Sequence, residues 1–180
     1  IEKRKKYHIK LLSNHKDSLH RGPVIEFNPK ISHDNYGFMK IGTGSLGGKA
    51  RGLAFAGDKL KKSSIYKKYP DINIRVPNVT VIATDEFDHF MTKNNLWEIA
   101  LKESNNKKLL DYFLNAKLDK NLIKNIKNLI KNIHYPIAVR SSSLSEDSQY
   151  QSLSGMYSTF MLPNNSQSLK ERVEQVCQAV

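Results

Sequence analysis

The feature that most restricts the fold is a unit of three segments between residues 38 and 62. The apolar run 38–41 has the length and composition of a short strand. A glycine cluster follows directly at 42–48, and residues 49–62 then carry apolar side chains at helical spacing. A strand, a glycine-rich turn and a helix in direct succession are typical of folds that combine helices with a sheet.

The rest of the chain alternates in the same way. Further strands are expected at 74–83, 137–139 and 157–162. Helices are expected from a Thr84 cap onward, at 95–117, at 119–134 and after a Ser168–Glu171 capping box. Residues 1–20 have a basic helical pattern, whereas 21–36 and 67–73 have the composition of irregular connections. We therefore expect a mixed α/β (α+β) fold.

The composition excludes several classes of protein. No apolar run approaches the roughly 20 residues that a membrane-spanning helix requires, and the charged N-terminus lacks the apolar centre of a secretory signal. The single cysteine, Cys177, cannot form an internal disulfide and is typical of a reducing compartment. These features indicate a cytoplasmic protein.

The net charge of +12 is compatible with a nucleic-acid partner or with an anionic small ligand. However, 23 of the 29 basic residues are lysines scattered through Asn-rich segments, and arginine is the residue that reads bases and binds phosphate with two hydrogen bonds. We therefore expect no nucleic-acid partner. In 119–134, lysines lie opposite an apolar helix face, at positions 120, 124, 127 and 131. This pattern favours a solvated face over a membrane-surface helix, so no membrane partner is expected.

The glycine cluster has the chemistry of a phosphate site. Glycine amides can approach an anion, a helix begins there, and Lys49 adds a positive charge. Three known patterns do not fit it. The Walker pattern would need Gly at Thr43 and a hydroxyl at Ala50, the dinucleotide pattern lacks its acid on a second strand, and the protein-kinase motifs are missing. Taken alone, the cluster is equally consistent with a flexible turn.

A second cluster is more specific. Arg140 leaves an apolar strand and is followed by three serines, a combination suited to holding phosphate oxygens. Together with the glycine cluster, this segment resembles the nucleotide-binding domain of pyruvate phosphate dikinase and phosphoenolpyruvate synthase, which is similar to ATP-grasp folds. The family pattern runs GGKGxNL, VPxGFxIT, VRSSAxxED and SFAGxxxTF. Segments resembling each stand in the same order at 47–53, 76–84, 140–147 and 152–160, and departures such as Arg51 and Ser143 indicate a divergent member.

The resemblance implies a role for each matching residue. Lys49 and Arg140 would hold the ATP phosphates, take part in catalysis and point into one cleft. Further nucleotide-binding residues would be Gly47, Gly48 and Ser141, with Gly155 and Thr159 on a covering loop. Residues 37–180 would be the first lobe of an ATP-grasp-like domain, preceded by a lead-in at 1–36. Mg²⁺ would be bound by ligands outside this chain.

The resemblance also implies an enzyme in which ATP phosphorylates a histidine of another domain, which then phosphorylates pyruvate or a related acceptor; the full-length enzyme could be a homodimer. None of the six histidines lies in a Gly/Ser/Thr-rich loop, and the last helix lacks a stop signal. We therefore expect one lobe of a larger enzyme that is inactive alone. Two alternatives stay open: a non-catalytic nucleotide-sensing module, and a basic interaction domain that uses its lysines.

Overall fold

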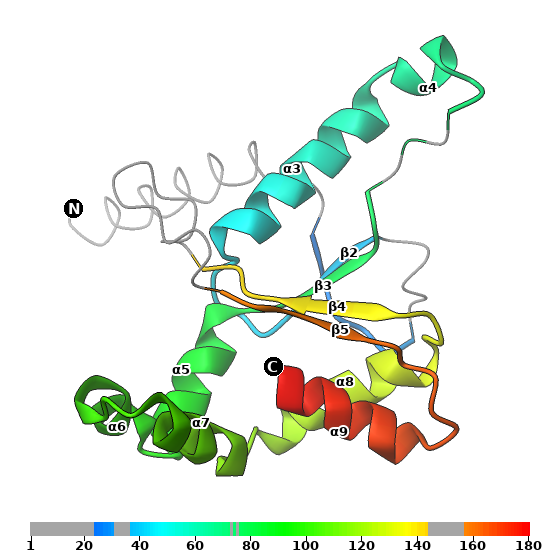
Figure 1. Cartoon of the computed structure of the whole chain (residues 1–180). Coiled ribbons are helices and arrows are strands. Elements are labelled where there is room, and N and C mark those ends of the chain that lie inside the picture. Colours follow the sequence, from blue (N-terminus) through cyan, green and yellow to red (C-terminus); the bar gives the residue numbers. More distant parts are fainter. Residues whose placement is uncertain (1–23, 31–36, 73, 75, 144–156) are drawn as a thin grey trace, which may run out of the picture.

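The computed structural model describes residues 24–30, 37–72, 74, 76–143 and 157–180. At its centre is a parallel sheet in the order β1-β2-β3, formed by β1 (Ile25–Glu26), β2 (Phe38–Ile41) and β3 (Val79–Ile82). Ile41 is paired with Ile82, so β2 and β3 end side by side. A separate antiparallel pair is formed by β4 (Ile137–Arg140) and β5 (Thr159–Leu162). The described part of the chain therefore has a mixed α/β fold (Figure 1).

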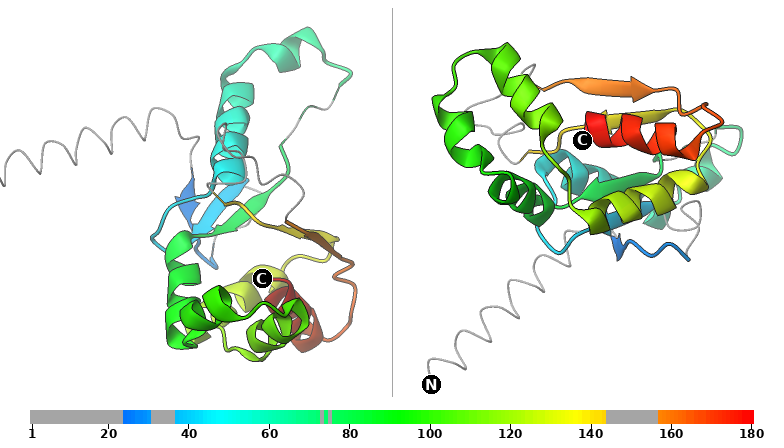
Figure 2. Two further views of the ribbon diagram at one scale, coloured as in Figure 1. Left: turned by 60° about the vertical axis from the view of Figure 1, so that its left-hand side comes forward. Right: turned by 90° about the horizontal axis from the view of Figure 1, so that it is seen from below.

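The helices form three groups around these sheets (Figures 1 and 2). The first group is α3 (Gly48–Lys62) with the short α4 (Ile65–Lys68) at its far end. The second consists of α5 (Thr84–Lys93), α6 (Leu96–Lys102) and α7 (Asn106–Asn115). The third is a side-by-side pair, α8 (Lys120–Lys131) and α9 (Leu169–Ala179). Among the described residues, no helix combines the length and the apolar composition that crossing a bilayer demands.

The parallel sheet separates two apolar cores. Alternate residues of a strand point to opposite faces, and Phe38 packs with Ala50 and Ala54 of α3, whereas Ile41 packs with residues of α8 and α9. The apolar residues of β4 and β5 that face α8 and α9 complete the second core. The strand β2 therefore borders a packed apolar core on each of its two faces.

The pair α8–α9 is joined by two buried polar side chains. Arg172 donates hydrogen bonds to the carbonyls of Ile130 and Ile133 at 3.2 and 2.8 Å. Asn164 donates to the carbonyls of Ile133 and Tyr135 at 2.9 and 3.0 Å. The last carbonyls of a helix have no partner within it and carry partial negative charge. Arg172 therefore binds the last turn of α8, and both side chains fix the segment 132–135 that follows it.

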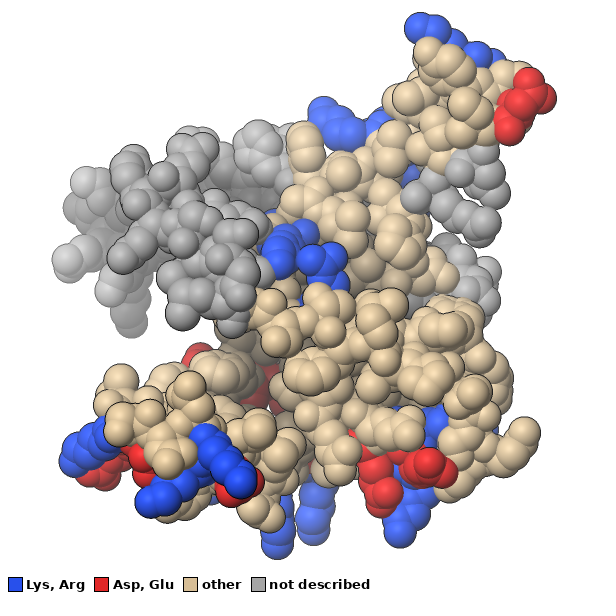
Figure 3. Space-filling model, in the orientation of Figure 1, with Lys and Arg blue, Asp and Glu red and all other residues tan. Residues whose placement is uncertain are grey.

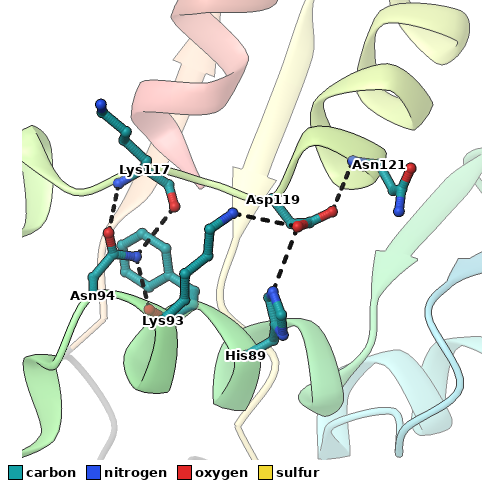
Figure 4. A network of polar contacts seen from close by, with 7 residues as sticks. His89, Lys93, Asn94, Lys117, Asp119 and Asn121 are labelled. Atoms are coloured by element: carbon teal, nitrogen blue, oxygen red, sulfur yellow. Dashed lines mark hydrogen bonds and ion pairs between the residues drawn. The ribbon is translucent and has the colours of Figure 1, made fainter.

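A polar network fixes α5 to the start of α8 (Figure 4). Asp119 accepts hydrogen bonds from the Asn121 amide at 2.7 Å and from Lys93 Nζ at 3.3 Å. The bond from Asn121, together with Lys93, lowers the pKa of Asp119 below its ordinary value. Asn94 accepts from the Lys117 amide at 2.9 Å and donates to the Lys117 carbonyl at 3.1 Å. These contacts fix the C-terminal end of α5 to the segment 117–119, which leads directly into α8.

Several expected elements have different limits in the structure. The strand expected at 74–83 is confined to β3, because Pro77 has no amide to donate to a sheet. The helix expected at 95–117 is two helices, because the Asn105 side chain accepts from two amides and caps α7. Residues 65–68 form α4, which overlaps the expected polar loop. Within 21–36, Ile25–Glu26 form β1, a strand too short to show a period.

Two expected helix caps also differ. Thr84 is the first residue of α5 rather than its cap, and its hydroxyl is used elsewhere, as described below. The Ser168 hydroxyl does accept from the Glu171 amide at 3.3 Å, as predicted, but the Glu171 carboxylate accepts from Ser166 and leaves the capping box half formed. The expected helix at 1–20 lies outside the described residues.

Candidate functional site

The glycine loop, residues 42–47, connects β2 to α3 and lies against the start of α5. Because β2 and β3 are parallel and end at paired residues, the segments that follow them leave the same edge of the sheet. There the Ser45 amide donates to Thr84 Oγ1 at 3.0 Å, and the Thr84 amide donates to the Ser45 carbonyl at 3.1 Å. The position of the loop is therefore a consequence of the sheet topology.

Asp85 makes a second attachment to the loop. Its Oδ2 accepts from both the amide and the hydroxyl of Thr43, each at 2.7 Å. Burial acts to raise the pKa of this carboxyl, but the hydrogen bonds from Thr43 lower it, and the net pKa lies below its ordinary value. Asp85 is consequently ionised at neutral pH, and both hydrogen bonds are made to a charged acceptor.

Two glycines of the loop are required by the approach of α5. Gly42 has a φ of +92°, a conformation that side chains disfavour. A Cβ on Gly42 would lie 2.6 Å from Asp85 Oδ1, and one on Gly44 would lie 2.6 Å from the Asp85 amide nitrogen. Contact with the protein itself thus explains both glycines without a ligand. Leu46, which follows them in the loop, is buried in the core formed with α3.

The start of α3 contacts the serine segment, residues 141–143, which follows β4. The Gly48 amide donates to the Ser143 carbonyl at 3.3 Å, and the Ala50 amide donates to Ser142 Oγ at 2.9 Å. The first amides of a helix have no partner within it, so Ser142 acts as the cap of α3 from 92 positions away. A Cβ on Gly47 would lie only 1.0 Å from the Ser142 carbonyl oxygen. Glycine is therefore necessary at position 47 for this contact to form.

The two clusters found in the sequence therefore meet in space. Lys49 is half-buried and lies between two residues that bond to the serine segment, and Arg140, which is exposed, immediately precedes that segment. The register of β4 and β5 pairs Arg140 with Thr159. The predicted residues Gly47, Gly48, Lys49, Arg140, Ser141 and Thr159 are thus on neighbouring segments, and Gly155 lies outside the described residues. That Lys49 and Arg140 share one cleft stays a prediction.

Arg51, in the first turn of α3, forms a hydrogen bond with the glycine loop. Its Nη2 donates to Ser45 Oγ, while its Nε is buried without a hydrogen-bond partner. This arginine is one of the departures from the family pattern. The structure gives it a place at the base of the glycine loop.

A comparison with protein families yields a match over residues 43–180 to the family described as pyruvate phosphate dikinase, AMP/ATP-binding domain. The match covers more than half of the chain and includes both segments that meet at α3. The chain belongs to the pyruvate phosphate dikinase AMP/ATP-binding domain family. This membership confirms the resemblance seen in the sequence and assigns the chain an AMP/ATP-binding domain of a kinase family. Neither the curated proteins nor the solved structures contain a match.

A magnesium site is not formed by the described residues of this family member. Within those ranges, no group of three or more His, Cys, Asp or Glu side chains is placed to hold a metal ion. The carboxylate nearest the glycine loop, Asp85, has one oxygen bonded to Thr43 and the other against Gly42 and Gly44. The carboxylates in the described part of the chain therefore do not fit the cation.

Sequence reasoning missed the residues that hold the loop in place. Thr84 and Asp85 were recognisable only as a helix start, where hydroxyls and carboxylates are common for other reasons. Ser142 was recognisable as one of three serines, but its bond to Ala50 depends on tertiary structure. The parallel pairing of β2 and β3 is the signal that could have placed Asp85 beside Thr43.

Proposed function

We propose that this chain is the phosphate-binding lobe of an ATP-dependent phosphotransferase, with Lys49 and Arg140 as the residues that bind the ATP phosphates. Residues 37–180 constitute the lobe, and the Mg²⁺ ligands belong to a second lobe outside it. In the intact enzyme, ATP phosphorylates a histidine of another domain, and that histidine phosphorylates pyruvate or a related acceptor.

The contact between the start of α3 and the serine segment carries the proposal. It brings the backbone of Lys49 close to the strand that ends at Arg140, although the two residues are far apart in the sequence. The amides of Gly48 and Ala50 are engaged by Ser143 and Ser142. Phosphate binding is therefore assigned to the two basic side chains rather than to these helix amides. Thr159 is the cross-strand neighbour of Arg140, and Ser141 follows Arg140 in the sequence.

The two cations have a direct chemical role in this function. Charge on the transferring phosphoryl group and on the leaving diphosphate is offset by positive groups that are already in place. Charged side chains also gather elsewhere: on the face shown in Figure 3, basic and acidic residues are mixed at the upper tip and along the lower edge. Those mixed regions give no concentrated positive field that would select an anion.

Calorimetry with ATP tests the assignment on the purified chain. The wild-type chain should bind ATP weakly and release no phosphate, and Lys49→Ala or Arg140→Ala should weaken binding further. The control is Lys61→Ala, which removes the same charge from an exposed position at the far end of α3. An equal loss in Lys61→Ala would favour the basic interaction domain.

The full-length enzyme gives the stronger test. Lys49→Ala or Arg140→Ala should lower its turnover by roughly a hundredfold or more, because each removes a contact to charge that develops in the transition state. Full activity in either variant would refute the site. ATP binding without any phosphoenzyme in the full-length protein would instead favour a nucleotide-sensing module.

A further inference from the structure

The glycine loop is attached to α5 by contacts that phosphate binding does not require. Thr43 donates two hydrogen bonds to Asp85. Ser45 donates one hydrogen bond to Thr84 and accepts another from it. From Ser45 the chain passes through the buried Leu46 to Gly47, where α3 and its residue Lys49 begin. Between β2 and Lys49, Thr43 and Ser45 are thus fixed by hydrogen bonds and Leu46 by burial. The hydrogen bonds of Thr43 are made to a carboxylate.

We propose that Asp85 is a positioning residue that holds the glycine loop in the conformation in which α3 presents Lys49 to the nucleotide, an inference that rests on the proposed function. Asp85 acts through Thr43 and does not contact the phosphates. Its geometry suits this role, because one oxygen accepts both Thr43 bonds while the other lies against Gly42 and Gly44.

Whether removal of the Asp85 carboxylate weakens or strengthens ATP binding distinguishes a positioning role from a purely electrostatic one. A carboxylate close to a phosphate-binding loop repels a triphosphate, so its removal would strengthen ATP binding if charge were its only contribution. A positioning role predicts the opposite result, because loss of the Thr43 bonds releases the loop. Binding to a loop that adopts the competent conformation only part of the time is weakened in proportion.

The experiment compares Asp85→Ala with Asp88→Ala, a control that removes the same charge from an exposed position one turn along α5. ATP affinity is measured by calorimetry, and amide hydrogen exchange is followed in peptides that cover residues 42–48. Asp85→Ala should weaken ATP binding by about tenfold, as expected for the loss of charge-assisted hydrogen bonds, and should accelerate exchange in the loop. Asp88→Ala should change neither quantity.

A second pair of variants keeps the test decisive if Asp85→Ala unfolds. Thr43→Val removes the hydroxyl donor to Asp85 but keeps the amide, whereas Thr43→Ser keeps both donors. Thr43→Val should weaken ATP binding several-fold at an unchanged melting temperature, and Thr43→Ser should restore it. In the double variant, the combined loss of ATP-binding free energy should be smaller than the sum of the two single losses, because Asp85→Ala and Thr43→Val remove one shared interaction.

The outcomes separate this inference from the function on which it rests. Tighter ATP binding by Asp85→Ala, or unchanged exchange in residues 42–48, would overturn the positioning role. Faster exchange with unchanged ATP affinity would show that Asp85 orders the loop without serving the nucleotide, and would also overturn it. If the wild-type chain and the full-length enzyme bind no ATP, the proposed function fails, whereas the exchange data still report on the attachment of the loop.

Discussion

Replacing Gly47 by alanine tests the junction between α3 and the serine segment directly. Gly47 has an ordinary extended backbone, with φ of −70° and ψ of 176°, so alanine meets no conformational penalty there. The obstacle is space. Its Cβ would lie 1.0 Å from the carbonyl oxygen and 2.1 Å from the carbonyl carbon of Ser142, both of which are backbone atoms that no rotamer change can move.

The serine segment must therefore withdraw by about 2.5 Å to reach an ordinary contact distance. That movement breaks the Gly48–Ser143 and Ala50–Ser142 hydrogen bonds and leaves two amides at the start of α3 without partners. Each bond contributes about 1 kcal/mol, and an unpaired buried amide costs a similar amount. We expect a loss of about 4 kcal/mol, which corresponds to a melting temperature lowered by roughly 8–16 °C in a chain of this size.

Gly52→Ala is the matched control in the same helix. A Cβ at Gly52 meets no atom within 4 Å, and the position is exposed. Alanine has the higher helix propensity, so this variant should gain up to about 1 kcal/mol. Thermal unfolding followed by circular dichroism, with ATP titration of each variant, gives both readouts. If Gly47→Ala has the same melting temperature as the wild type while Gly52→Ala is stabilised, the close approach of Ser142 to α3 does not exist.

Two surface charges and one half-buried acid give further tests. Reversing Lys124 and Lys127 to Glu should change the unfolding free energy by less than about 0.5 kcal/mol, because both are exposed; lost binding to nucleic acid or anionic vesicles would instead indicate an interaction surface. Burial, and then the charges of Asp85 and Asp119, raise the pKa of Glu86 above 4.5. Ionised Glu86 therefore destabilises the fold, and stability falls as the pH rises from about 4.5 through the raised folded pKa. Glu86→Gln should remove this fall, raising the melting temperature slightly at pH 7 but not at pH 4; a lower value at pH 7 would contradict the sign.

Periodicity was sufficient to predict the helices with one apolar face. In α8 the buried residues Leu122, Ile126 and Ile130 recur at helical spacing, and the four lysines predicted to be solvated are exposed. Short elements were harder to predict. Two residues of β1 carry no period, and the break between α6 and α7 depends on a single cap at Asn105. The start of α7 is decided by this side-chain cap, whereas β1 depends on its pairing with β2.

For the site, the motif residues were predictable but their mutual contacts were not. The order of four motif segments was sufficient to identify the family, which the family match confirms. The use of the glycines could not be deduced, because the same residues serve an anion, a turn or a close backbone approach. Only the structure shows that Gly44 accommodates Asp85 and that Gly47 accommodates Ser142.

The buried arginine between α8 and α9 also has a consequence for the order in which the chain folds during synthesis. The carbonyls of Ile130, in the last turn of α8, and of Ile133, just beyond it, accept hydrogen bonds from Arg172 and Asn164, which are made about 30 to 40 residues later. Until the ribosome has released those residues, these carbonyls lack their side-chain donors, and the apolar face of α8 has no α9 to cover it. We expect α8 to be a late-maturing element of the nascent chain and a place where a chaperone could bind. The start of α3 has the same property, because its first amides must wait for Ser142 and Ser143.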